Sequence, residues 1–171
     1  DALDEGLYSQ KKSIVLTSAT LSTQGHLHFA RERLGLKSAQ EMVLGSSFDY
    51  PASALIYILE NIPAPNQPGY QAGVEEAIAA LARAAGGRTL GLFTSYAALQ
   101  ATREAVKPRL EAEGIQVLGQ GVDGSPPQLL EAFKGSPRAL LLGTSSFWEG
   151  IDVPGDALSL LVIPRLPFPV P

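Results

Sequence analysis

The stretch RTLGLFTSYAALQATREAV, Arg88 to Val106, decides the fold class. Its first part, Arg88 to Thr94, is an apolar, β-rich run that predicts a buried strand. From about Tyr96 the apolar residues Leu99 and Val106 recur at helical spacing, so a helix follows the strand after a very short connection. A strand that runs directly into a helix is the repeating unit of α/β proteins with parallel sheets.

The same alternation continues on both sides of this stretch. Strands are expected at 13–17, 54–62, 88–94, 115–118, 139–142 and 159–163. Helices are expected over Leu27 to Leu34 with Gly35 as the stop, over Val74 to Ala85 with Gly86-Gly87 as the stop, from Tyr96, and from Ser125-Pro126-Pro127-Gln128, which has the pattern of a capping box. Pro108 is expected to kink or restart the helix that contains it. The sequence therefore predicts an α/β domain whose mainly parallel sheet carries helices on both faces.

Composition bounds the possible functions. The 171 residues are 45% hydrophobic and 18% charged, which is a globular composition, and the net charge is -4. A protein that holds nucleic acid by itself usually has a basic surface, so any such contact here is local or shared with a partner. The chain has no cysteine, which excludes disulfides and thiolate metal sites and fits a reducing compartment. No apolar run approaches the roughly 20 residues that span a bilayer.

The two ends predict an excised fragment. The start, DALDEGLYSQKK, has neither an initiator Met nor the features of a signal peptide, and the chain stops on LPFPVP.

Three clusters of small polar residues follow expected strands, and ligands in parallel sheets bind beyond the carboxyl ends of strands. The clusters are Thr17-Ser18-Ala19-Thr20, Thr94-Ser95-Tyr96 and Gly143-Thr144-Ser145-Ser146. Hydroxyl and backbone N–H groups at such points can hold a phosphate, whereas the alternative is that they only cap the next helix. Tyr96 stacks on a base or packs internally.

The third cluster opens the segment LLLGTSSFWEGIDVPG, Leu140 to Gly155. Phe147 and Trp148 are adjacent and are expected to point different ways, one into the core and one outward. Glu149 and Asp152 flank Gly150, and carboxylates three residues apart can accept ribose hydroxyls or an arginine, or form a salt-bridged turn.

Four segments together resemble one family. TSATLS, GLFTSY and GTSSFWEGIDVPGDALSLLVIPRLPFPVP are similar to motifs III, IV and V of the DinG/XPD branch of superfamily two helicases. GSSFDYPASALIYI resembles the segment of that branch between motifs III and IV. The matches occur in the family's order along nearly the whole chain, and the motif V segment is the most specific of them.

The resemblance implies a three-layer RecA-like domain of the P-loop NTPase type, the second of two that grip ATP and Mg²⁺ between them while single-stranded DNA crosses both. It implies a cytoplasmic protein of DNA repair or replication. Coupling between nucleotide and DNA maps onto Thr17, Ser18 and Thr20. DNA contacts map onto Thr94, Ser95, Tyr96, Thr144 and Ser145, and nucleotide contacts onto Glu149, Gly150 and Asp152. No metal ligand maps onto this chain. Residues 1–171 then form a partial second motor domain, and residues 1–44 either pack on it or contact the first motor domain.

Three parts of the family pattern are missing. The sequence has no G-x-x-x-x-G-K-[ST] loop, no Asp-Glu-x-His segment and no final arginine motif. We therefore expect the chain alone not to hydrolyse ATP. The alternative function is a non-catalytic α/β module that binds a phosphorylated ligand or a protein partner.

A few remaining residues carry weaker expectations. His26 and His28 are two apart and do not share a helix face, which disfavours a metal site. Arg103 and Lys107 share a face that meets either phosphate or solvent. Arg165 follows the last expected strand and is the better candidate for a contact in a cleft.

Overall fold

The computed structural model describes residues 2–36, 38–148 and 151–167. The chain divides into two compact units, Asp1–Tyr57 and Ile58–Pro171, and each is described by itself. In the described residues no helix is both long enough and apolar enough to cross a membrane.

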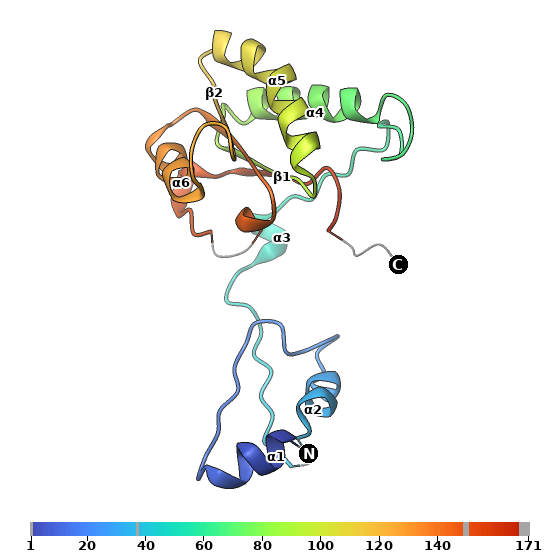
Figure 1. The fold of residues 1–171 in the computed structure, drawn as a ribbon, viewed down its shortest axis with the longest axis vertical. Helices are drawn as coiled ribbons and strands as arrows, with labels where there is room; N and C mark the ends of the chain where they lie inside the picture. Colours follow the sequence, from blue (N-terminus) through green and yellow to red (C-terminus); the bar gives the residue numbers. More distant parts are fainter. Residues whose placement is uncertain (1, 37, 149–150, 168–171) are drawn as a thin grey trace. The chain divides into compact units, whose positions relative to one another are not determined.

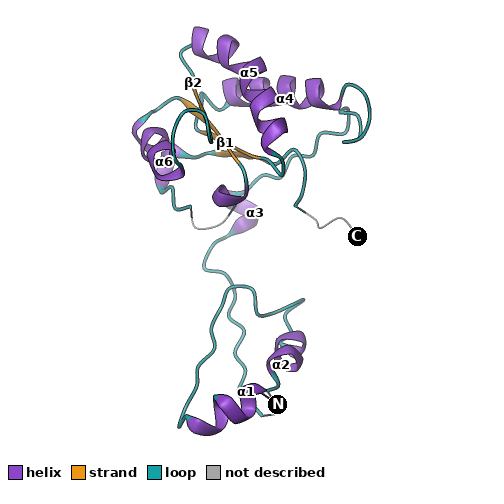
Figure 2. Ribbon diagram, viewed as in Figure 1, coloured by secondary structure: helices purple, strands orange, loops and turns teal. Residues whose placement is uncertain are grey.

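The second unit is built on a parallel sheet (Figure 2). Its strands are β1 (Thr89–Leu92), β2 (Gln116–Gly119), β3 (Ala139–Gly143) and β4 (Leu160–Val162), in the spatial order β2-β3-β1-β4. All three pairings are parallel, with Leu90 opposite Leu141 between the two central strands. The predicted α/β class with a parallel sheet is confirmed.

Helices cover both faces of this sheet (Figure 1). On one face lie α4 (Tyr70–Ala84) and α5 (Tyr96–Ala112), which pack against each other, and on the other lies α6 (Pro126–Gly135). Successive strand residues point to opposite faces. Leu140 and Leu142 of β3 therefore join the α4–α5 core, while Leu141 joins the α6 core.

The helix boundaries have local causes. The Ser95 hydroxyl accepts a hydrogen bond from the Ala98 N–H at the start of α5, at 3.4 Å. The Gln128 side chain accepts one from the Ser125 N–H at 3.0 Å, within the predicted capping box of α6. Gly87 follows α4 with φ +88°, and a Cβ there would lie 2.6 Å from the backbone nitrogen of Ala139, so this close approach requires glycine.

The expected break at Pro108 does not occur, because α5 continues through it. Val106 and Leu110, on either side of Pro108, are both fully buried against the sheet. This packing holds the helix together where one backbone hydrogen bond is missing.

In the first unit the described residues form only short elements: α1 (Ala2–Gly6), η1 (Tyr8–Gln10), α2 (His28–Leu34) and α3 (Tyr50–Ser53). The predicted stop of α2 at Gly35 is confirmed, since Gly35 caps it with φ 66°. The strands predicted at 13–17 and 54–62 are wrong for this structure, because neither range forms a described strand. Val15 and Leu55 are 83% and 92% exposed, and an extended segment without a pairing partner is not stable as a strand.

Candidate functional site

Two of the three hydroxyl clusters lie at the same edge of the sheet. Thr94 and Ser95 follow β1, and Thr144 to Ser146 follow β3, which is the direct neighbour of β1 in the sheet. Because the strands are parallel, their carboxyl ends meet at one edge, where α/β proteins bind their ligands. The structure thus brings the predicted residues of these two clusters together.

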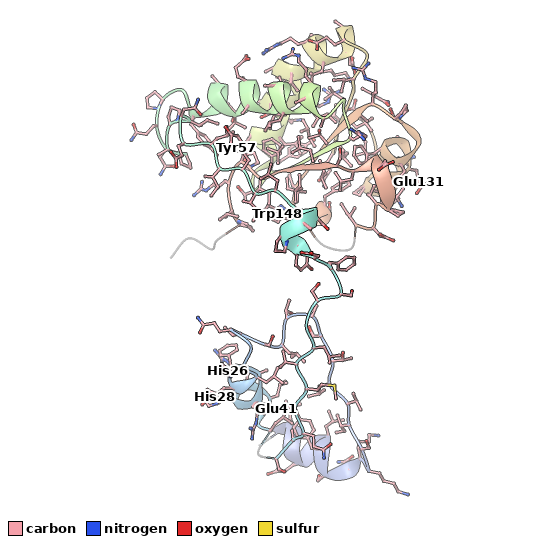
Figure 3. All side chains as sticks on the ribbon, turned by 180° about the vertical axis from the view of Figure 1, so that it is seen from behind. His26, His28, Glu41, Tyr57, Glu131 and Trp148 are labelled. Atoms are coloured by element: carbon pink, nitrogen blue, oxygen red, sulfur yellow. The ribbon has the colours of Figure 1, made fainter. Side chains whose placement is uncertain are left out.

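The connection after β3 is shaped by close packing. A Cβ on Gly143 would lie 2.6 Å from Cδ2 of Phe147, so glycine lets the aromatic ring pack directly on the end of the strand. The short helix η2 (Ser145–Phe147) follows, with Phe147 buried in the α6 core. Trp148, labelled in Figure 3, is half-buried rather than outward-pointing. It packs on the same core, and its Nε1–H donates to the Phe93 carbonyl at 3.3 Å.

Gln120, at the carboxyl end of β2, holds the β3 connection in place. Its Oε1 accepts hydrogen bonds from the Thr144 N–H at 2.7 Å and the Thr144 hydroxyl at 3.0 Å. Its Nε2 donates to the Ser146 hydroxyl at 2.9 Å. Both Thr144 donors are therefore satisfied, while among the described residues the exposed Ser145 hydroxyl has no protein partner.

Sequence reasoning missed Gln120 because it searched for hydroxyl residues after strands. The available signal was its position, a polar side chain between Gly119 and Gly121 directly after an expected strand.

The cluster after β1 is divided between structural and free groups. The Ser95 hydroxyl caps α5 by accepting a hydrogen bond, and this bond does not use its own O–H donor. Tyr96 is 41% exposed, and its hydroxyl accepts a hydrogen bond from Gln100 Nε2 at 3.4 Å and contacts Gly121. Thr94 is exposed, and its hydroxyl has no partner among the described residues.

A cavity of about 370 Å³ opens beside Thr94, at the ends of β1 and β4. It is lined by Pro65, Gln67, Gly69, Tyr70, Gln71, Val74, Phe93, Thr94, Ser95, Ala98, Pro164 and Arg165. The Tyr70 hydroxyl donates to the Pro164 carbonyl at 2.8 Å, which joins the start of α4 to the end of β4. Burial raises the pKa of Tyr70, and the Arg165 charge opposes that rise.

Arg103 and Lys107 share one helix face, as predicted, and both pair with Asp123, while Lys107 also pairs with the neighbouring Glu111. Arg103 makes a two-point contact with Asp123, with nitrogen–oxygen distances of 2.7 and 2.6 Å, and Lys107 lies 3.4 Å from the same carboxylate. The hydrogen bond from Arg103, and a further one from the Gly119 N–H, lower the pKa of Asp123 to about 2. Partial burial of the carboxylate opposes this by raising the pKa, but its effect is smaller. This network fixes the loop between β2 and α6 and leaves neither cation free.

The first cluster lies in the other unit and follows no strand. The Ser18 and Thr20 hydroxyls are 3.2 Å apart, and the Thr20 N–H donates to Ser18 Oγ at 3.1 Å. Thr17, Ser18 and Thr20 are all exposed. These contacts form a local turn. The three residues do not follow a described strand, unlike those of the other two clusters.

The predicted nucleotide residues are only partly covered by the structure. Glu149 and Gly150 lie outside the described residues. Asp152 is exposed between Ile151 and Val153, which pack against the α6 core. In the parts that the structure describes, no three His, Cys, Asp or Glu residues are grouped as they would be around a metal ion, and His28 lies 3.4 Å from Glu32 on its own helix.

Comparison with known proteins identifies the family of this chain. Residues 78–171 match the model of a family described as "Helicase C-terminal domain". Over its whole length the chain is 38% identical to the 3'-5' exonuclease DinG of Bacillus subtilis and 40% identical to the ATP-dependent DNA helicase YoaA of Escherichia coli, covering 19% and 26% of those proteins. It is 40% identical, over 94% of its length, to the ATP-dependent helicase DinG of Mycobacterium tuberculosis, of which it covers 24%. The chain thus spans about a fifth to a quarter of the length of these curated relatives. It belongs to the helicase C-terminal domain family, as a C-terminal helicase domain of the DinG type.

Proposed function

We propose that this chain supplies part of the second RecA-like motor domain of an ATP-dependent DNA helicase, which unwinds duplex DNA or translocates on single-stranded DNA in repair or replication. The observation that carries the proposal is the pair of hydroxyl-bearing connections at the carboxyl ends of neighbouring strands β1 and β3. They occur in a chain of the helicase C-terminal domain family, whose relatives include proteins named ATP-dependent helicases.

The DNA contact is assigned to this edge. The exposed hydroxyls of Thr94 and Ser145 donate to backbone phosphates, and such contacts position a strand without reading its sequence. Thr144 acts indirectly, since its N–H and hydroxyl already donate to Gln120. The Ser95 and Tyr96 hydroxyls accept one hydrogen bond each within the chain and keep their own O–H groups for the DNA strand. With a net charge of -4, the chain binds DNA weakly by itself and shares the strand with the other motor domain.

The nucleotide contact is assigned to Glu149, Gly150 and Asp152. Asp152 is exposed, and its neighbours Ile151 and Val153 pack on the α6 core, so its carboxylate is held outward on an anchored segment. A carboxylate there can accept a ribose hydroxyl or an arginine of the opposite domain. ATP supplies the free energy for movement, and its Mg²⁺ is assigned to the other motor domain.

The first unit is assigned to the boundary between the two motor domains. None of its residues whose burial is described is buried, although Val15, Met42 and Leu44 are apolar and more than 75% exposed. Apolar surface of this kind gains free energy when a partner covers it. We assign residues 1–44 to contact with the first motor domain and Thr17, Ser18 and Thr20 to the coupling of nucleotide and DNA states.

The test is Asp152→Ala in the full-length protein, with Asp156→Ala as the matched control, since Asp156 is an exposed carboxylate on the same segment. We expect DNA-stimulated ATP turnover to fall about tenfold or more in the first variant and to stay within about twofold in the second. Thermal unfolding of both variants should match that of the parent. Normal turnover with Asp152→Ala contradicts its assigned role, and turnover that does not respond to DNA in the parent protein contradicts the motor itself.

A further inference from the structure

The cavity between the ends of β1 and β4 has the size and position of a ligand site. Its volume of about 370 Å³ lies within the range of about 300–1,000 Å³ that is usual for small-molecule pockets. It adjoins Thr94, whose hydroxyl is free, and it lies at the carboxyl edge where this sheet is expected to meet a ligand.

The charge of this cavity is positive, and Arg165 is its only source. Among the residues that line the cavity, Arg165 is the single charged side chain. In the described part of the second unit the other basic side chains are paired with carboxylates, except Arg88 and Arg138. Both of these precede strands, β1 and β3, and so lie at the amino edge of the sheet. Arg165 is therefore the unpaired cation of the carboxyl edge, in a cavity without a carboxylate.

The rest of the lining suits a sugar and a base. Tyr70 is half-buried, and the hydrogen bond from its hydroxyl to Pro164 fixes the ring at the cavity wall. Val74 and Phe93 are buried and add apolar surface. The Gln71 amide is already bonded to Glu75 at 2.8 Å and to Thr102 at 2.9 Å, so it does not compete for the ligand. The cavity thus offers a cation and a hydroxyl donor to an anion, and an aromatic ring to an apolar ring of the ligand.

We propose that this cavity holds one nucleotide of single-stranded DNA, with its phosphate at Arg165 and Thr94 and its sugar and base against Tyr70. The proposal rests on the proposed function and adds a second contact on the strand, besides the one at Ser145. Stacking on an aromatic ring together with a backbone cation is the usual means of binding a single strand without sequence preference.

The first test measures binding of a fluorescein-labelled oligothymidylate to the 171-residue chain by anisotropy at several salt concentrations. Arg165→Ala should weaken binding about fivefold or more and reduce the slope of log affinity against log salt by about one. Arg138→Ala is the matched control, because it removes a positive charge that forms no salt bridge in the described residues and lies at the opposite edge, and it should leave affinity and slope nearly unchanged. Equal effects of the two variants would show that only net charge matters, and the cavity assignment would then be wrong.

The second test locates the base. An oligonucleotide that carries 5-iodouracil is irradiated with the chain, and the crosslinked residue is identified by mass spectrometry. We expect Tyr70, with the crosslink retained in Tyr70→Phe, which keeps the ring, and lost in Tyr70→Leu. A crosslink confined to Tyr96 or Trp148 overturns the proposal, as does displacement of the oligonucleotide by ATP.

The outcomes separate this inference from the proposed function. If Ser145→Ala weakens binding while Arg165→Ala and Tyr70→Leu do not, the DNA contact stands and the cavity is not part of it. If the unaltered chain does not bind the oligonucleotide at any salt concentration, both the assigned DNA contact and the cavity proposal are wrong.

Discussion

At the scale of single residues, Gln120 carries the organisation of the candidate site. Its one carboxamide satisfies two donors on Thr144 and donates to Ser146, so the connection after β3 has a defined shape before any ligand arrives. Preorganised donors lower the cost of ordering a loop on binding. The exposed hydroxyl of Ser145 is presented by this arrangement and takes no part in it.

Two variants of Gln120 distinguish the effect of the loop's hydrogen bonds from the effect of an added negative charge. Gln120→Ala removes all three hydrogen bonds and should lower the free energy of unfolding by about 1–3 kcal/mol. Gln120→Glu keeps an acceptor for Thr144 but adds a negative charge beside the assigned phosphate contact. Unfolding in urea should therefore rank Gln120→Glu above Gln120→Ala, while affinity for single-stranded DNA should rank them in the opposite order. Gln116→Ala, at an exposed residue of β2, is the control. The same ranking in both measurements would mean that affinity only follows stability.

At the scale of elements, the connection between β3 and η2 depends on the absence of a side chain at Gly143. A Cβ there would lie 2.6 to 2.8 Å from three atoms of the buried Phe147, namely Cδ2, Cγ and Cβ, so the side chain or the strand must shift. Gly143→Ala should destabilise the chain by about 1–3 kcal/mol, as overpacking of a core does, and should weaken DNA binding by displacing Thr144 to Ser146. Gly135→Ala, at the end of α6, meets no atom within 4 Å and should leave stability unchanged or slightly higher. Urea unfolding of both variants checks this, and equal stability of the two contradicts the packing argument.

The elements also show which features could be predicted from the sequence. Apolar runs such as Ala139–Gly143 formed strands because their pairing partners are in the chain, whereas 13–17 and 54–62 have a similar pattern but no partner strand among the residues that the structure describes. The hydroxyl connections after β1 and β3 were predictable because polar residues follow apolar runs directly. The contacts of Gln120 with Thr144 and of Arg103 with Asp123 join residues that are 24 and 20 positions apart in the sequence. The course of the connecting loops brings these residues together. No sequence period encodes such a path, so these contacts became visible only in the structure.

At the scale of the whole molecule, the buried core belongs to one unit. The buried hydrophobic residues, from Val74 to Phe147, all lie in the second unit, and none of the first unit's residues whose burial is described is buried. Local stability follows buried apolar contacts and protected backbone hydrogen bonds. The two units should therefore differ sharply in how readily their backbone opens, even though one chain contains both.

Hydrogen exchange followed by mass spectrometry tests this difference and the role assigned to the first unit. In the 171-residue chain, amides of β1 and β3 should exchange slowly, with the free energy of global unfolding, because both strands are paired and buried. Amides of 13–17 and 54–57 should exchange near the rate of an unstructured peptide, since neither range is in a described strand. In the full-length protein, the amides of 13–17 should become protected, because the first motor domain then supplies the partner that their exposed apolar side chains lack. Strong protection of 13–17 in the 171-residue chain would contradict the structure of the first unit. Protection that stays absent in the full-length protein would contradict the assigned contact with the first motor domain and leave the second unit's assignment intact.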